Sequence, residues 1–208
     1  MRPRVEWLAC RCPRIRDART CRELSTTDLC GDGWVLHTQG MVERVPGTSL
    51  SVPELMARAR MMLEENQYLT LATADSGGEP WSTTVWYCTS PDVGSPSGIA
   101  VQFIWLSMPE SRHSKNLMER SEVGISIFNS TQPAGTGDGL QFAARATLAD
   151  SAGLDETVKT FSRASLAAGG GPWTRAQVEA PARPRLYVAT ATQAFVLANG
   201  GRSQIPVG

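Results

Sequence analysis

The sequence has no excess charge of either sign and no long apolar run. Its 208 residues carry 20 Lys and Arg side chains against 20 Asp and Glu side chains, so no global field attracts nucleic acid or an anionic membrane. No stretch approaches the roughly 18 consecutive apolar residues of a membrane-spanning helix. The composition, 41% hydrophobic and 19% charged, is that of a globular protein. We therefore expect small molecules or other protein chains as partners, and neither nucleic acid nor membrane.

Groups for autonomous catalysis are scarce. Beyond residue 40 the sequence has one histidine, His113, and one cysteine, Cys88, so one chain has no histidine cluster there and we predict no metal site. A Ser-His-Asp triad would have to use His113, which has no nucleophile-elbow motif around it. Phosphate-loop and dinucleotide-binding glycine motifs are missing, since the glycines between 135 and 139 have the wrong spacing. These gaps favour a domain that takes its chemistry from a bound cofactor.

Residues 1–46 differ from the rest of the chain. Four of the five cysteines lie in the first thirty residues, at Cys10, Cys12, Cys21 and Cys30. With His37 they could hold zinc, but the paired C-x-x-C spacing of zinc sites is missing, and the pattern does not indicate a secreted disulfide scaffold. We expect a disordered extension and a cytoplasmic protein. An alternative is that the natural protein starts at Met41.

Residues 47–208 are expected to form one domain with three helices. Ser51-Val-Pro-Glu54 has the pattern of a capping box and predicts a helix to about Asn66. Ser107-Met-Pro-Glu110 repeats the pattern and predicts a second helix to about Arg120. A third helix is expected at 154–167, followed by a loop at Gly169–Pro172.

Six strands are expected between these helices, because the apolar residues there alternate or are rich in β-branched and aromatic types. They cover 68–74, 81–88, 99–106, 123–128, 140–147 and 186–197. The third is apolar on both faces, as expected where one face fills a barrel and the other is covered. The order of strands and helices predicts an α+β fold built on an antiparallel β-barrel.

One segment, Ser107–Asn116, concentrates polar groups at the end of a strand and the start of a helix. The helix start offers free N–H groups and the positive end of its dipole, which favour an anion. Around it stand two cations, two hydroxyls and an imidazole, on Arg112, Lys115, Ser111, Ser114 and His113. This set of donors suits a phosphate monoester. The alternative is an ordinary solvated helix start with Lys115 paired to Glu119.

Several short motifs, in order over about 150 residues, resemble the pyridoxamine 5′-phosphate oxidase-like family. They are Leu71–Asp75, Glu79–Pro80, Val85–Tyr87, Trp105–Ser107, Ser111–Leu117, Ile127–Pro133 and Arg185–Thr190. The resemblance implies a six-stranded antiparallel split β-barrel with flanking helices, a homodimer, and an FMN in each of two clefts at the subunit interface. Each motif alone is weak, and the combination carries the resemblance.

The resemblance also implies cofactor-binding residues by position. The flavin phosphate would be held by Ser111, Arg112 and His113, with Lys115 and Ser107 close by. The strand residues Thr83, Thr84, Val85 and Trp86 would run along the isoalloxazine edge. Gln141 would reach the flavin of the neighbouring subunit, the alternative being an ordinary exposed strand residue.

Three tryptophans, Trp81, Trp86 and Trp105, have flat aromatic faces that suit a planar ring. One prediction is that they line a flat pocket. We favour the alternative, that they fill the barrel or the dimer interface.

Departures from the family pattern limit what the resemblance implies. Where the namesake oxidase has an Arg and a Lys for the flavin phosphate, this sequence has Thr83 and Cys88. The basic C-terminal motif that contacts the oxidase's substrate has no counterpart in Asn199–Gly208. The resemblance thus predicts a cleft that binds a flavin, but it does not predict the substrate.

We therefore expect an FMN-dependent oxidoreductase that acts on an unidentified small molecule. The alternatives are a deazaflavin-dependent reductase and a non-catalytic flavin-binding or sensing module. Haem degradation, known among split-barrel relatives, would have to use His113, which already belongs to the phosphate motif. No catalytic residue is predicted.

Overall fold

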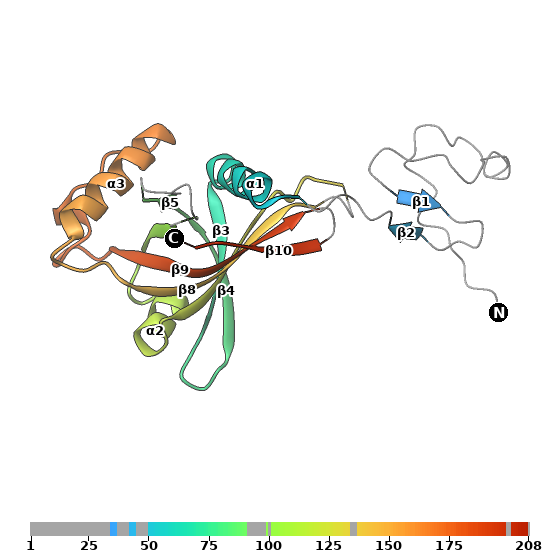
Figure 1. Ribbon diagram of the computed structural model, residues 1–208. Helices are drawn as coiled ribbons and strands as arrows, with labels where there is room; N and C mark the ends of the chain where they lie inside the picture. Colours follow the sequence, from blue (N-terminus) through green and yellow to red (C-terminus); the bar gives the residue numbers. More distant parts are fainter. Residues whose placement is uncertain are drawn as a thin grey trace, which may run out of the picture. The chain divides into compact units, whose positions relative to one another are not determined.

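The computed structural model describes residues 50–90, 99, 101–133, 137–198 and 201–207, and the backbone of two short strands before them (Figure 1). The chain divides into two units, Met1–Ser49 and Leu50–Gly208. In the first, β1 (Trp34–Leu36) pairs antiparallel with β2 (Val42–Arg44). The rest of the expected extension, with its cysteines, His37 and Met41, lies outside the described residues, and its disorder stays a prediction.

The second unit is an antiparallel sheet in the order β4-β3-β7-β8-β9-β6-β5, with β10 on β9. Its strands are β3 (Tyr68–Ala74), β4 (Pro80–Trp86), β5 (Cys88–Thr89), β6 (Gln102–Ser107), β7 (Glu122–Phe128), β8 (Gly139–Leu148), β9 (Arg185–Ala198) and β10 (Gly201–Ile205). Three helices flank it: α1 (Val52–Glu65), α2 (Arg112–Glu119) and α3 (Leu154–Ala167), with a short 3₁₀ helix, η2 (Arg175–Gln177). The α+β split-barrel fold is thus confirmed.

The connection between β4 and β5 explains why the sheet curls. These strands stand at opposite ends of the strand order, yet only Tyr87 separates them in sequence. Tyr87 is buried, and its hydroxyl donates to the carbonyl of Leu63 at 3.2 Å. Because one residue spans only a few ångströms, the two ends of the sheet must approach each other. Figure 1 shows the strands wrapping around one another as this closure requires.

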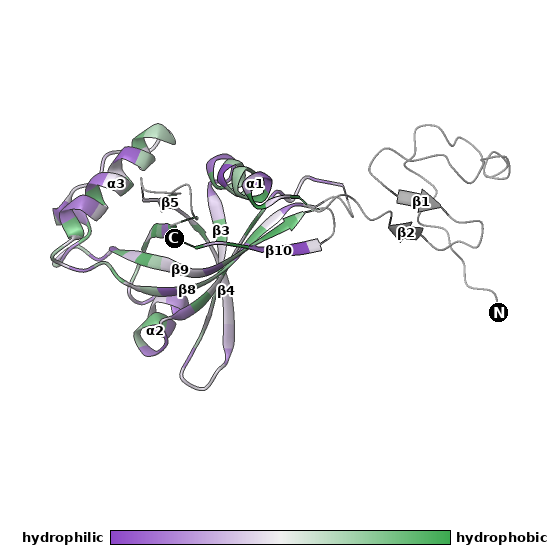
Figure 2. Ribbon diagram, in the orientation of Figure 1, coloured by the Kyte–Doolittle hydropathy of each residue, from purple (hydrophilic) through white to green (hydrophobic). Residues whose placement is uncertain are grey.

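Two hydrophobic cores lie on opposite faces of β6. Phe103 and Trp105 belong to the main core, which α1 covers with Leu55, Met56, Ala59, Met62 and Leu63. Ile104 belongs to a second core with Leu154, Val158 and Phe161 of α3. The expectation that this strand is apolar on both faces is confirmed. Figure 2 shows the mixed polar and apolar faces of α1 and α3 that such packing needs.

Several predicted boundaries are wrong. The strand expected at 81–88 ends at Trp86, because Tyr87 turns into the core and Cys88 pairs with Ile104 of β6. The strand expected from Ile99 begins at Gln102. The short strand β10 was not anticipated, because four of its five residues are exposed and it is held by backbone pairing to β9.

The helix predicted from the capping box at Ser107 begins later, at Arg112. Ser107 is still the last residue of β6 and pairs with Arg185 of β9. Ser111 is the actual N-cap, and its side chain accepts a hydrogen bond from the Ser114 N–H. By contrast, the capping box of Ser51 and Glu54 is confirmed. No helix of the described part is long and apolar enough to cross a bilayer.

Candidate functional site

A cleft of about 580 Å³ opens in the second unit between β4, the start of α2 and the helix α3. Its size suits a small-molecule site, since such pockets typically span about 300–1,000 Å³. Three strands, two helices, the residue before β3 and the segment after α3 supply the lining: Gln67, Tyr68, Thr84, Val85, Trp86, Leu106, Ser107, His113, Phe161, Ser165, Ala168, Gly170 and Trp173. Of the residues predicted to bind the cofactor, Thr84, Val85, Trp86, Ser107 and His113 are among them.

Hydroxyl groups and one imidazole form a connected network at the start of α2. Ser107 Oγ lies 2.6 Å from His113 Nε2 and 3.1 Å from Ser111 Oγ. Ser111 Oγ lies 3.2 Å from His113 Nε2 and 2.8 Å from the fully buried Ser114 Oγ. Burial lowers the pKa of His113, so its imidazole is neutral near neutral pH.

The backbone at the same place favours an anion. The helical hydrogen bond from Lys115 N to Ser111 O, at 3.0 Å, leaves the N–H groups of Arg112 and His113 ahead of it. These groups lie where the positive end of the helix dipole is. The start of α2 therefore combines backbone and side-chain donors around Ser107.

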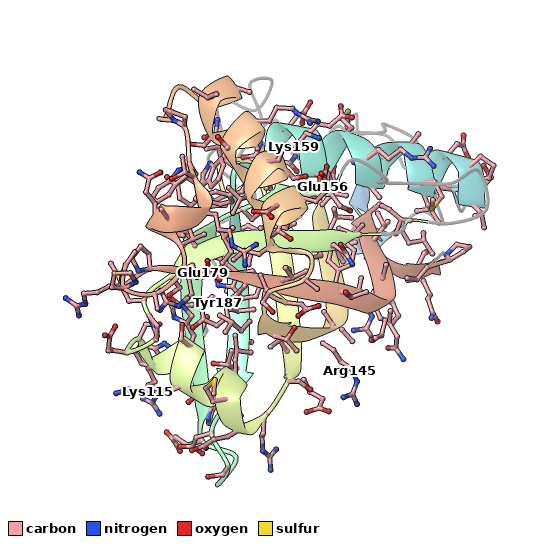
Figure 3. The ribbon with its side chains drawn as sticks, turned by 90° about the vertical axis from the view of Figure 1, so that its left-hand side faces the viewer. Lys115, Arg145, Glu156, Lys159, Glu179 and Tyr187 are labelled. Carbon is pink, nitrogen blue, oxygen red and sulfur yellow. The ribbon has the colours of Figure 1, made fainter. Side chains whose placement is uncertain are left out.

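The two cations of the motif do not line the cleft. The Arg112 guanidinium lies over the Trp81 ring, 4.6 Å from the centroid, which is a cation–π contact. Lys115 is exposed, and Figure 3 shows it on the outer side of α2. Glu119, the alternative partner of Lys115, accepts a hydrogen bond from the Ser76 N–H at 2.7 Å. The network at the cleft is thus mainly of neutral donors.

Asn116 anchors α2 to the β3–β4 hairpin, a role that the sequence did not reveal. Its side chain is 4% exposed, and Nδ2 donates to Thr73 Oγ1 at 3.0 Å. Thr73 is also buried, and its hydroxyl lies 3.5 Å from the Trp81 carbonyl. Buried polar groups are stable only when paired, so this pair fixes where the helix start lies relative to β4.

The strand β4 forms a second side of the cleft. It ends the strand order and, among the strands that the structure describes, pairs with β3 alone, with Thr84 opposite Thr70 and Val85 opposite Leu69. In an antiparallel pair, alternate backbone N–H and C=O groups point away from the partner. The other edge of β4 therefore offers backbone donors and acceptors to a ligand. Thr83 lies on this strand but does not line the cleft.

The third side is aromatic, and most of its residues were not recognisable as site residues from the sequence. Phe161 of α3 contacts Trp86 edge-to-face, with centroids 5.3 Å apart, and Trp173 at 5.9 Å. Trp86, expected in a pocket or a core, thus takes part in both. Trp105 is fully buried and stacks on Tyr187, as expected for a tryptophan that fills the barrel. Trp81 is 39% exposed, and the Arg112 guanidinium lies over its ring.

Two other singled-out residues lie away from the cleft. Gln141 is exposed on β8, between Ser126 of β7 and Phe195 of β9, so any contact with a flavin would be to that of another subunit. Cys88 is buried in the second core, and burial raises the pKa of its thiol to about 12. A thiol of this kind is neutral and unreactive at physiological pH.

The residues present fit a flavin mononucleotide. The donors at the start of α2 match a phosphate monoester, even without the Arg and Lys that Thr83 and Cys88 replace. The free edge of β4 matches the polar edge of a ring.

The sequence of this domain matches a known family. Residues 55–198, more than half of the chain, match the family model for pyridoxamine 5′-phosphate oxidase. No curated protein sequence matches the chain.

Solved structures share the fold at low identity. HutZ, the heme storage protein of Vibrio cholerae, is 19% identical with a TM-score of 0.52, over 68% of this chain and 94% of that one. A heme-binding protein of Mycobacterium smegmatis is 16% identical with a TM-score of 0.54, over 76% and 59%. A pyridoxamine 5′-phosphate oxidase of Listeria innocua, assigned as such without proof of activity, is 16% identical with a TM-score of 0.50, over 70% and 99%. Such similarity shows the split-barrel fold alone.

Proposed function

The chain belongs to the pyridoxamine 5′-phosphate oxidase family, and from this premise we propose that it binds FMN in the cleft and acts as an FMN-dependent oxidoreductase on a small molecule. The observation that supports this most is the cleft itself. A helix start rich in neutral donors and the free edge of β4 face the same space of about 580 Å³. A phosphate and a polar ring edge need these two sets of groups at the two ends of one site.

In this proposal Ser107, Ser111 and His113, with the first N–H groups of α2, hold the phosphate. Thr84, Val85 and Trp86 present the edge of β4 to the ring. Thr83, on the same strand, pairs with Leu71 of β3 and so helps to hold β4 in place. Arg112 and Lys115 contribute charge from outside the cleft. A bound flavin supplies the centre that accepts or donates electrons, so the chain's own groups bind, orient and exclude water.

Haem is the second cofactor that the neighbouring structures raise, because two of them are heme proteins by name. Within the described residues the one imidazole is that of His113. It is 8% exposed, and its Nε2 lies 2.6 Å from Ser107 Oγ and 3.2 Å from Ser111 Oγ. Iron ligation would have to break these contacts and expose the ring. We therefore favour flavin.

We also propose that the protein is a homodimer in which Gln141 faces the flavin of the partner. Its exposure on β8, away from its own chain's cleft, is what such a role requires. Light scattering gives the mass of the assembly. If the protein is a dimer and Gln141→Ala leaves FMN affinity within about twofold, the role of Gln141 is wrong while the dimer stands.

The decisive experiment is a titration of the purified protein with FMN, followed by its absorbance and by quenching of flavin fluorescence. We expect saturable binding with one FMN per chain. Ser107→Ala should weaken it by about 0.5–1.5 kcal/mol, the contribution of one neutral hydrogen bond. Ser203→Ala, on the exposed strand β10 outside the cleft, is the matched control and should leave affinity unchanged. No binding of FMN would reject the proposal.

The same samples separate the alternatives. A purified protein whose main absorbance band lies at a shorter wavelength than that of oxidised flavin indicates a deazaflavin. Tight FMN binding without reduction by NADH or NADPH favours a binding or sensing module. Uptake of added haem, with its intense Soret band, in preference to FMN favours the haem alternative.

A further inference from the structure

One side of the cleft is a cluster of aromatic rings, and the cofactor proposal uses the backbone edge of β4 at Trp86 but none of the rings. Phe161 of α3 contacts both Trp86 of β4 and Trp173 after α3 edge-to-face, at interplanar angles of 83° and 67°. All three line the cleft, together with Leu106 at the end of β6. We call these three rings the aromatic wall. Phe161 is buried, whereas Trp86 and Trp173 are half-buried and thus accessible from the cleft.

The loop after α3 holds Trp173 in place. Gly169 has φ +82°, a left-handed conformation that ends α3 and that favours glycine. A Cβ at Gly170 would lie 2.6 Å from Ser165 Oγ and 3.1 Å from the Ser165 carbonyl oxygen, so a larger residue does not fit there. Ser165 Oγ donates to the Gly171 carbonyl, and the Trp173 N–H donates to Ser162 Oγ at 2.9 Å. The chain thus folds back onto α3 and sets Trp173 beside Phe161.

Charge is missing from the cleft lining. Among the described residues, the lining contains no Lys, Arg, Asp or Glu, and its one titratable base is His113. The donors that suit an anion lie at the start of α2, at the other side of the cleft. If a cofactor phosphate takes those donors, a second anion in the cleft would have no charged partner, and desolvation would disfavour it.

We propose that the aromatic wall binds an uncharged, planar aromatic molecule, which is the substrate class of the site. That the bound molecule is a substrate rests on the proposed function. The preference of the aromatic wall for such a molecule does not depend on it. Flat rings pack against accessible tryptophan faces and edges. Because they are uncharged, their transfer from water into a pocket without charges carries little desolvation penalty, and the burial of their apolar surface is favourable. A phosphorylated substrate is excluded by the same lining.

Three probes with the same fused two-ring skeleton test the inference by calorimetric titration of the FMN-loaded protein. They are 2-naphthol, 2-naphthyl phosphate, which adds a charged phosphate group, and decahydro-2-naphthol, which is neither planar nor aromatic. We expect 2-naphthol to bind at least about tenfold more tightly than either of the others. Equal or tighter binding of 2-naphthyl phosphate would overturn the claim on charge. Equal binding of the saturated probe would overturn the claim on planarity.

A variant of the wall tests its location. Trp173→Ala should weaken 2-naphthol about fivefold, while FMN affinity changes by less than about twofold. Phe128→Ala removes an exposed aromatic ring outside the cleft and should change neither. Unchanged 2-naphthol binding in Trp173→Ala would overturn the location. If that variant does not fold, Trp173→Leu, which keeps apolar bulk without a ring, is titrated in its place with the same expectation.

The outcomes separate this inference from the proposed function. A protein that binds FMN but not 2-naphthol keeps the function and loses the inference. If the protein takes up no FMN, the proposed function fails, and 2-naphthol is titrated against the FMN-free protein. Binding that Trp173→Ala weakens then supports the wall, and no binding overturns it.

Discussion

The start of α2 and the aromatic wall border the same cleft, but they are stabilised in different ways. At α2 the groups come from one short segment, Ser107–Ser114, and hydrogen bonds connect them. In the aromatic wall the rings come from β4, α3 and the loop after it, and packing connects them. The first arrangement is local and polar, whereas the second is non-local and apolar. The two sides therefore favour different parts of a ligand and should respond differently to substitution.

The largest expected effect is on stability, at the aromatic wall. Phe161→Ala should lower the free energy of unfolding by about 3–5 kcal/mol, because Phe161 is 2% exposed and its loss leaves a cavity in the second core. Phe128→Ala, at a ring that is 53% exposed, should cost less than about 1 kcal/mol. Urea unfolding of the two variants measures the difference. Equal losses would mean that the wall is not part of a packed core.

The next effect is on cofactor affinity, at the polar side. Arg112→Ala should weaken FMN binding by about 1–2 kcal/mol, roughly the contribution of a charge-assisted interaction. Arg145→Ala is the control, since Arg145 is exposed on β8 (Figure 3). Its guanidinium pairs with Glu122. Fluorescence titration with FMN measures both. An unchanged dissociation constant in Arg112→Ala would show that Arg112 serves only to cover Trp81.

A smaller effect is the pH dependence that His113 gives to stability. Burial lowers its pKa in the folded protein, so the unfolded chain binds more protons in mild acid. Its contribution to stability is present above the ordinary histidine pKa of about 6.5 and is lost as the pH falls toward the folded-state pKa. His113→Gln should flatten this dependence in urea unfolding at several pH values. His37→Gln should keep the pH dependence of stability. If His113→Gln keeps it as well, the dependence comes from a group other than His113.

The smallest expected effect is that of the N-terminal residues. Removal of residues 1–40 should leave FMN affinity within about twofold, because every described residue that lines the cleft belongs to the second unit, Leu50–Gly208. Titration of the shortened protein with FMN measures this. A loss of FMN binding in a shortened protein that still unfolds cooperatively would show that the extension contributes to the site.

The same contrast between local and non-local features explains what could be predicted. The cap at Ser51, the helix at 154–167 and the loop at Gly169–Pro172 depend on neighbours within a few residues, so their patterns identified them. The strand boundary at Trp86 was missed because Cys88 pairs with β6, far along the chain. The start of α2 was misplaced by the second capping-box pattern, because pairing to β9 keeps Ser107 in a strand.

The sequence by itself determined the donor-rich segment Ser107–Asn116 and the family, because both depend on residue types in a fixed order. Only the tertiary structure decided what faces that segment. Phe161 and Trp173 reach the cleft because α3 packs on the far face of β6, and Arg112 turns onto Trp81 because Asn116 anchors α2 to the hairpin through Thr73. Such contacts join residues distant in sequence, and their geometry depends on how the whole sheet curls.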